Sequence, residues 1–223
     1  MIAIRRSVAP PRPGGVPCGG VPRRWPQRGM EARMLQAQGV GYTAIIVRSL
    51  RDSMDFYQRL GLVPVYVEPN RDDPESLCAL MYCGGNDSFI MLVGPAEGAR
   101  VAIAEAQPGV GSMQYLSLNV SRDTMTEIWH AMSTAGVSGS EEIVRGYERL
   151  VFLEDPNGVL ITLTAWNTEP PAGMPRALIL VRAAAIRERD GAAYVEDSHI
   201  QQAIAEIIRD SRGPGGPRPP SNN

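Results

Sequence analysis

The sequence contains no lysine and only two histidines, His130 and His199. All 22 basic residues are therefore arginines, and they face 24 acidic residues for a formal net charge of -2. A chain without excess positive charge has no broad field to attract nucleic acid or an acidic membrane surface. The composition therefore predicts a chain that binds neither nucleic acid nor membrane.

Cysteine and long apolar runs are also scarce. The three cysteines are Cys18, Cys78 and Cys83, an odd number that does not suit a disulfide framework. No uninterrupted apolar stretch approaches the roughly 20 residues that a membrane-spanning helix needs. We therefore expect reduced thiols and a cytoplasmic protein.

The two ends of the chain differ from its centre. Residues 1–38 are rich in proline and arginine and contain a single acidic residue, Glu31, and residues 213–223 are rich in glycine and proline. Such segments bury too little apolar surface to offset the entropy lost on ordering. We predict either a disordered leader over 1–38 or a true translation start at Met30 or Met34, and a disordered tail over 213–223. Residues 169–212 are predicted to form an extension with a helix.

The centre shows one pattern twice. Residues 42–48 alternate like a strand, and residues 50–60 place apolar side chains at helical spacing, with Gly61 as a stop. Three further strand-like runs follow. The same order of strand, helix and three strands recurs after residue 112, which indicates an internal duplication. The strands predicted in the two copies cover residues 42–48, 62–67, 77–82 and 89–93, then 114–120, 142–144, 149–153 and 159–165, and the second helix covers 122–135.

The last two predicted strands are joined by Asp155-Pro156-Asn157-Gly158, and Asn-Gly is a strong hairpin signal. Asp155 is expected to cap this turn with its side chain rather than act in catalysis. A second segment of interest, 97–106, is rich in alanine and is predicted to form a short helix.

Three segments resemble one known superfamily. Thr43–Val65 and Tyr115–Val137 are similar to the opening strand and helix of its modules, and Arg149–Leu163 is similar to its closing hairpin. The superfamily is that of vicinal oxygen chelate proteins, which includes glyoxalases, bleomycin-resistance proteins and ring-cleaving dioxygenases. The resemblance implies an α+β domain over 39–168, with βαβββ modules at 40–95 and 112–167. Together the modules are expected to form an open, cup-shaped mixed sheet with outer helices.

Enzymes of this superfamily usually hold a divalent metal in the cup, through His, Glu or Gln at four strand positions. The resemblance places Tyr42, Met91, Tyr115 and Thr162 at these positions. Phenol, thioether and hydroxyl groups are poor ligands for a catalytic divalent ion. His130 falls in the predicted second helix and His199 in the extension, so neither replaces a ligand. We therefore predict no metal and no cofactor.

Strand alternation predicts which side chains face the cup. They form an apolar and aromatic surface with a few hydroxyls and one amide, as is typical of small-molecule pockets. The candidate ligand-binding residues are Tyr42, Ile46, Phe89, Met91, Tyr115, Ser117, Asn119, Thr162 and Trp166.

Two functions are compatible with these residues. In the first, the protein binds and sequesters a small, largely hydrophobic or aromatic metabolite without a metal, as in drug resistance. In the second, it is an enzyme of the superfamily (an isomerase, cyclase, lyase or ring-cleaving dioxygenase) that acts on an oxygenated metabolite. Either way the expected partner is a small molecule, and the resemblance implies a homodimer.

Overall fold

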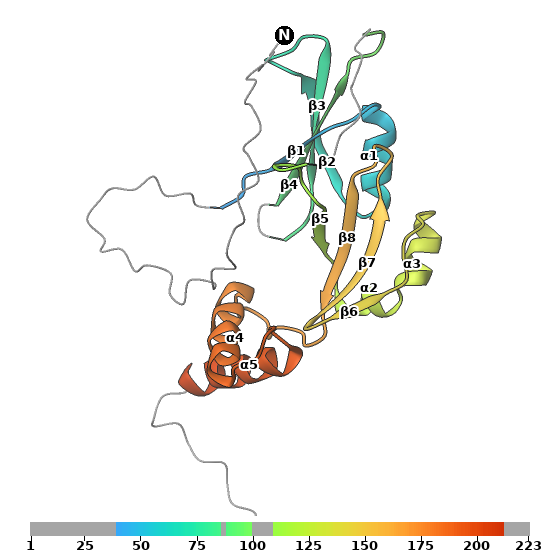
Figure 1. Cartoon of the computed structure of the whole chain (residues 1–223). Helices are drawn as coiled ribbons and strands as arrows, with labels where there is room; N and C mark the ends of the chain where they lie inside the picture. Colours follow the sequence, from blue (N-terminus) through green and yellow to red (C-terminus); the bar gives the residue numbers. More distant parts are fainter. Residues whose placement is uncertain (1–38, 86–87, 100–108, 212–223) are drawn as a thin grey trace, which may run out of the picture. The chain divides into compact units, whose positions relative to one another are not determined.

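The first copy of the repeated pattern forms a four-stranded sheet and one helix. It comprises β1 (Thr43–Ile46), α1 (Leu50–Arg59), β2 (Val63–Pro69), β3 (Ser76–Tyr82) and β4 (Phe89–Pro95). The strand order is β1-β4-β3-β2, with β1 parallel to β4 and the other pairs antiparallel. The computed structural model describes residues 39–85, 88–99 and 109–211 (Figure 1). The predicted leader and tail, and most of the predicted helix at 97–106, lie outside these residues.

The second copy repeats this topology. It comprises β5 (Leu116–Asn119), α2 (Arg122–Thr126), α3 (Ile128–Ala135), β6 (Ile143–Arg145), β7 (Glu148–Glu154) and β8 (Leu160–Trp166). Its strand order, β5-β8-β7-β6, matches that of the first sheet position by position. The predicted α+β fold of two βαβββ modules is thus confirmed. The two sheets remain separate, since no described strand of one pairs with a strand of the other.

The helix predicted over 122–135 is interrupted at Glu127, whose backbone (φ -104°, ψ 22°) is not helical. Three hydrogen bonds favour this break. Arg149 of β7 donates to the carbonyl oxygen of Met125 and to Oγ1 of Thr126, and Thr126 in turn donates to the carbonyl of Arg122. Side chains that compete for helical carbonyl groups in this way commonly bend a helix.

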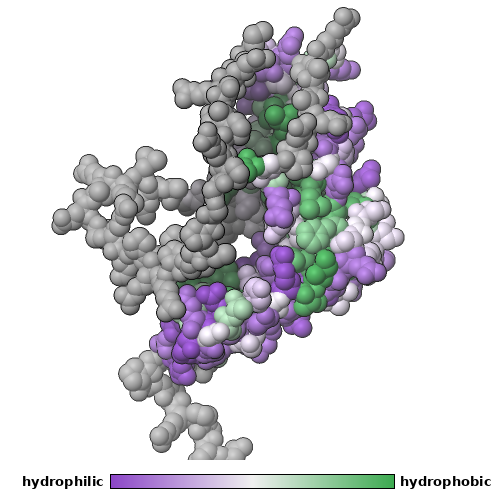
Figure 2. Space-filling model, in the orientation of Figure 1, coloured by the Kyte–Doolittle hydropathy of each residue, from purple (hydrophilic) through white to green (hydrophobic). Residues whose placement is uncertain are grey.

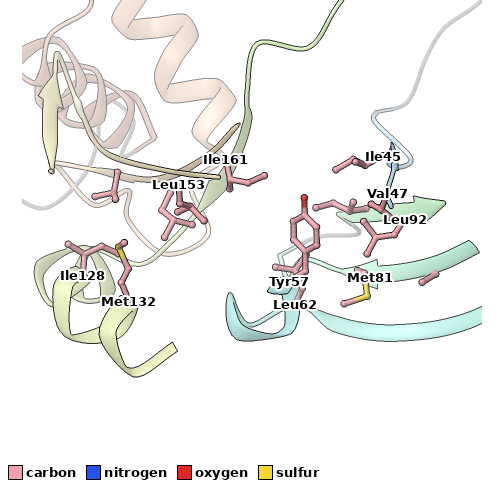
Figure 3. Packing of buried hydrophobic residues seen from close by; sticks show 14 of the residues in the cluster. Ile45, Val47, Tyr57, Leu62, Met81, Leu92, Ile128, Met132, Leu153 and Ile161 are labelled. Atoms are coloured by element: carbon pink, nitrogen blue, oxygen red, sulfur yellow. The ribbon is translucent and has the colours of Figure 1, made fainter. Parts of the chain in front are cut away.

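Each sheet buries the face that its own helix covers. In the first module Ile45, Val47 and Leu92 pack on that face with Tyr57 of α1 (Figure 3). In the second module Leu153 and Ile161 lie opposite α3 (Figure 3). The alternate residues of the same strands lie on the opposite face of each sheet, which we call the open face. The open faces are therefore where surface for a ligand remains.

A buried hydrogen-bond cluster joins the two modules. The Tyr57 hydroxyl donates to Oδ2 of Asp155 over 3.2 Å, and the Asn157 amide donates to Oγ of Ser53 over 2.9 Å. Oδ1 of Asp155 also accepts from the backbone N–H groups of Asn157 and Val159, both at 2.8 Å. The structure therefore agrees with the turn-capping role expected of Asp155. We call Ser53, Tyr57, Asp155 and Asn157 the module joint.

The environment of Tyr57 in the module joint favours the hydrogen bond from its hydroxyl to Asp155. Burial, together with the adjacent Asp155 carboxylate, raises the pKa of Tyr57 well above its usual range. The phenol therefore keeps its proton and remains a donor to Asp155. Asp155 itself is only 4% exposed, so its carboxylate depends on these protein donors rather than on water.

Two helices follow the second module, where one was expected. They are α4 (Arg176–Asp190) and α5 (Asp197–Ser211), and they pack on each other through buried residues such as Ile179 and Ile200. The pair also contacts the second module. A Cβ added to Gly146, which has φ +60°, would come within 2.7 Å of the Val195 carbonyl oxygen in the α4–α5 loop. No helix within the described ranges is long and apolar enough to cross a membrane.

An ion pair between Glu142 and Arg149 gives a first prediction. The Glu142 carboxylate accepts hydrogen bonds from Nε of Arg149 at 2.6 Å and from Nη2 at 3.0 Å. These hydrogen bonds lower the pKa of Glu142. Because the pKa is lower in the folded state, the pair stabilises the fold above the pKa of the unfolded chain, and this contribution disappears as the pH falls through the folded pKa. Glu142→Gln is therefore expected to cost about 1 kcal/mol at neutral pH and nothing in strong acid.

Urea denaturation of both proteins across the acid range measures this difference. Glu141→Gln is the matched control, because Glu141 is exposed and forms no ion pair in the described structure. A difference that stays constant with pH would contradict the role assigned to the Glu142 carboxylate.

Candidate functional site

The open face of the second sheet carries most of the polar candidates. In strand register, Ser117 lies beside Thr162 and Asn119 lies beside Thr164. Across β8, Phe152 lies beside Thr162. Because residues paired in register point to the same face, these side chains form one continuous surface.

Two threonines within this surface differ in their hydrogen bonding. Oγ of Ser117 and Oγ1 of Thr164 lie 2.8 Å apart and satisfy each other. Thr162 is 0% exposed, and its Oγ1 has no hydrogen-bond partner. A buried hydroxyl without a partner is unfavourable, and few such groups occur in native structures. Thr162 therefore offers an unused donor and acceptor on the open face.

An aromatic pair crosses β8 on the same face. The rings of Tyr115, which precedes β5, and Phe152 of β7 meet edge to face with centroids 6.1 Å apart. They come from opposite sides of β8, so the contact passes over its open face close to Thr162. The pair supplies an apolar surface beside Thr162, which pairs with Phe152 in register.

A cavity of about 310 Å³ lies where the two modules meet along the free edge of β5. Three of the predicted residues, Phe89, Ser117 and Asn119, line it. Its size is at the lower end of the range for small-molecule pockets. The other residues that line it are Val40, Thr43, Leu60, Leu62, Cys83, Gly84, Gly85, Ser88, Ile90, Leu116, Leu118, Val120 and Leu163.

The other six predicted residues do not line this cavity, and three of them, Tyr42, Ile46 and Met91, belong to the first module. Met91 lies beside Ala44 in register, on the open face of the first sheet. Ile46 and Tyr42 are 70% and 57% exposed, respectively. Apolar and polar surface is interspersed over the described residues on the side of the molecule shown in Figure 2. The structure thus divides the nine predicted residues between two sheets instead of gathering them in one pocket.

Trp166 requires a correction. It was predicted to bind a ligand, but it is 5% exposed and belongs to the cluster of apolar residues formed with α4 and α5. Its ring meets that of Tyr147 edge to face, with centroids 5.2 Å apart. The physical reason is that the two C-terminal helices cover the end of β8, so the indole is occupied by protein contacts.

The donor set does not fit a divalent metal ion. Tyr42, Met91, Tyr115 and Thr162, the residues at the expected ligand positions, are weak ligands for such an ion. His130 is exposed on α3, and Nδ1 of His199 accepts a hydrogen bond from the backbone N–H of Glu196. Over residues 39–85, 88–99 and 109–211, no cluster of three or more His, Cys, Asp or Glu residues could hold a metal ion.

Comparisons with known proteins match the part of the chain that holds the two modules. The model of the Glyoxalase/Bleomycin resistance protein/Dioxygenase superfamily matches residues 39–163, which is more than half of the chain. The chain belongs to this superfamily. A comparison with curated proteins found no match.

Several solved structures are similar to part of this chain at low sequence identity. The crystal structure of SMU.1112c is 17% identical, covers 58% of this chain and 100% of its own, and has a TM-score of 0.50. A glyoxylase/bleomycin resistance protein/dioxygenase domain from Frankia sp. EAN1pec is 16% identical, with coverage of 59% and 100% and a TM-score of 0.47. The fosfomycin resistance protein FosX from Listeria monocytogenes is 14% identical, with coverage of 57% and 92% and a TM-score of 0.44.

The glyoxalase-superfamily match ends at Leu163, so α4 and α5 lie beyond it. One residue of this extension reaches the open face of the second sheet. Nη1 of Arg176 donates to Oδ1 of Asn119 over 2.5 Å, and the guanidinium carbon lies 5.1 Å from the centroid of a Trp166 ring. Sequence reasoning missed Arg176, because no local pattern links it to a residue 57 positions earlier.

Glu148 was not among the candidate ligand-binding residues. It lies beside Trp166 in register and therefore on the open face of the second sheet. Burial raises the pKa of Glu148, although Arg145 acts in the opposite direction. Strand alternation from Leu150 and Phe152 was a signal that could have placed this carboxyl group on the open face.

Proposed function

We propose that this glyoxalase-superfamily protein binds a small, largely hydrophobic or aromatic metabolite without a metal ion and sequesters it. The observation that carries the proposal is the cavity of about 310 Å³ between the two modules, with Phe89 on one side and Ser117 and Asn119 on the other. Pockets of this kind combine apolar walls with a few polar groups that fix the orientation of the ligand.

The open face of the second sheet extends the proposed site beyond the cavity. Ser117 and Asn119 belong to both, because β5 is an edge strand that pairs only with β8 among the described strands. The Tyr115–Phe152 pair provides aromatic surface, and Thr162 provides an unpaired hydroxyl. A flat aromatic ligand with an oxygen substituent suits this combination.

Binding of 1-naphthamide to the full chain tests the proposal. We expect the neutral aromatic probe to bind after treatment of the protein with EDTA, because no step of the proposed binding uses a metal. Ser117→Phe fills the site and is expected to weaken binding at least ~10-fold, since it removes the space next to β5. Isothermal titration calorimetry measures both affinities.

Ser133→Phe serves as the matched control, because Ser133 is exposed on α3. Equal affinities of wild type and Ser117→Phe would place the probe elsewhere and contradict the proposed site. Elemental analysis that finds one metal ion per chain, lost together with binding on EDTA treatment, would contradict metal-independent binding.

A metal-independent acid–base enzyme is the second candidate function, and Glu148 favours it. A carboxyl group with a raised pKa on the open face is suited to accept a proton from a bound substrate. Lyase and dioxygenase chemistry fits less well, because the donor set does not suit a metal. A bound metabolite recovered unchanged from D2O supports the binder. Deuterium exchange that Glu148→Gln abolishes supports an isomerase or cyclase instead.

Assembly and location stay predictions. The homodimer is expected from the resemblance to bleomycin-resistance proteins, and light scattering of the full chain at micromolar concentration tests it. The cytoplasmic location rests on the few cysteines and the lack of long apolar runs, and the absence of nucleic-acid binding rests on the lack of excess basic residues.

A further inference from the structure

The extension after the superfamily domain brings a positive charge to the proposed ligand surface. Arg176 is the first residue of α4, and its guanidinium is held from two sides. Nη1 donates to Oδ1 of Asn119 on β5, and the ring of Trp166 at the end of β8 lies beneath the guanidinium carbon. Stacking on an indole face stabilises an arginine and restricts its orientation.

Arg176 differs from several other arginines of the second module and the helical pair, which bind carboxylates. Arg149 binds Glu142, Arg182 binds Glu206 and Asp210, and Arg189 binds Asp190 and Glu206. No described carboxylate lies within 4.0 Å of the Arg176 guanidinium, and Asn119 is its one hydrogen-bond partner among the described residues. A guanidinium has five N–H donors, so most of those on Arg176 remain available.

The groups next to Arg176 already form a surface suited to a ligand. Asn119 and Thr164 are neighbours in register, and Thr162 lies two residues further along the same face of β8. Thr162 is 0% exposed and its hydroxyl has no hydrogen-bond partner. This second observation indicates that a polar ligand group on this face could supply the missing hydrogen bond. Beyond it lies the Tyr115–Phe152 ring pair.

We propose that the C-terminal helical pair completes the ligand site by presenting Arg176, and that the site selects aromatic or apolar ligands with a carboxylate group. The carboxylate binds the free N–H groups of Arg176, and the apolar body extends past the hydroxyls of β5 and β8 toward Tyr115 and Phe152. A guanidinium recognises a carboxylate through two parallel hydrogen bonds, which adds specificity as well as affinity. This inference rests on the proposed function, because it specifies the chemistry of the ligand for the same site.

The charge of Glu148 bears on this assignment. Its strand position places it beside Trp166, yet it forms no ion pair with Arg176 within 4.0 Å. If the two side chains paired in solution, Arg176 would not be available to a ligand, and the site would show no preference for a carboxylate.

The test compares two probes of nearly equal shape, 1-naphthoate and 1-naphthamide, on the full chain by isothermal titration calorimetry. We expect wild type to bind the carboxylate about 10-fold more tightly than the amide, since one charge-assisted pair contributes about this much. Arg176→Gln should reduce the affinity for 1-naphthoate to that for 1-naphthamide and leave the amide unchanged. Arg176→Lys should retain part of the preference.

Arg189→Gln is the matched control, because it removes a charge from the same helix at the end distant in sequence from Arg176. It is expected to keep the wild-type preference. Equal affinity of wild type for both probes would overturn the inference and leave the proposed function intact. Failure of wild type to bind either probe would contradict both. The comparison of the two probes on wild type is informative even if the Arg176 variants do not fold.

Discussion

Asp155→Ala is expected to lower the free energy of unfolding by about 3 kcal/mol, a large loss for a single substitution. The substitution removes the acceptor for the backbone N–H groups of Asn157 and Val159 and for the Tyr57 hydroxyl. Because the site is buried, these donors cannot turn to water, and each lost hydrogen bond has its full cost. Urea denaturation followed by circular dichroism measures the change.

Two further substitutions show whether the loss comes from the hydrogen bonds of the module joint or from any change in this turn. Glu154→Ala is the matched control, because Glu154 is adjacent and exposed, and it should change stability by less than about 0.5 kcal/mol. Tyr57→Phe removes only the hydrogen bond from the phenol and should cost about 1 kcal/mol. Similar losses for Asp155→Ala and Glu154→Ala would show that the module joint does not stabilise the fold.

The module joint also matters for the proposed function. It connects the turn after β7 to α1, and both modules contribute residues to the cavity along β5. Loss of the joint removes fixed contacts between the two walls of this cavity. Asp155→Ala is therefore expected to weaken binding of 1-naphthamide as well, although no joint residue lines the cavity.

Ile179→Ala is expected to lower the free energy of unfolding by about 3 kcal/mol. Ile179 is 0% exposed in the cluster that α4 and α5 form with Trp166, and truncation leaves a cavity as well as less buried apolar surface. Urea denaturation measures the loss. Val181→Ala is the control, because Val181 lies on the same helix and is 72% exposed.

The result for Ile179→Ala bears on how the extension is held. A loss comparable to the small one expected for Val181→Ala would contradict the packing of the helical pair. If the packing is as described, a weakened helical pair also holds Arg176 less firmly against Trp166. The preference for 1-naphthoate over 1-naphthamide is then expected to decrease in Ile179→Ala, while 1-naphthamide affinity is retained.

Much of the fold could be predicted from local patterns. The spacing of apolar residues in 50–60 and the Asn157-Gly158 turn determined one helix and one hairpin close to where they occur. The duplication then determined the topology, because two copies of one pattern form the same sheet. Strand alternation also placed Ser117 and Thr162 on one face, as their register confirms.

Contacts between distant segments could not be predicted in this way. The helix break at Glu127 follows from Arg149, which reaches back 24 residues to the Met125 carbonyl. The partner of the Tyr57 hydroxyl lies 98 residues away, on a turn whose local role as a cap was predicted correctly. Alternation indicates which face a side chain takes, but it does not indicate what packs on that face.

The sequence by itself thus determined the α+β class and the two βαβββ modules, because these depend on residue type and local spacing. Only the tertiary structure decided that Trp166 is buried beneath α4 and α5, that Arg176 reaches Asn119, and that the hydroxyl of Thr162 has no partner. These features depend on which surfaces meet. The free energy of such contacts arises where two segments far apart in the chain meet, so it cannot be predicted from the local sequence of either segment.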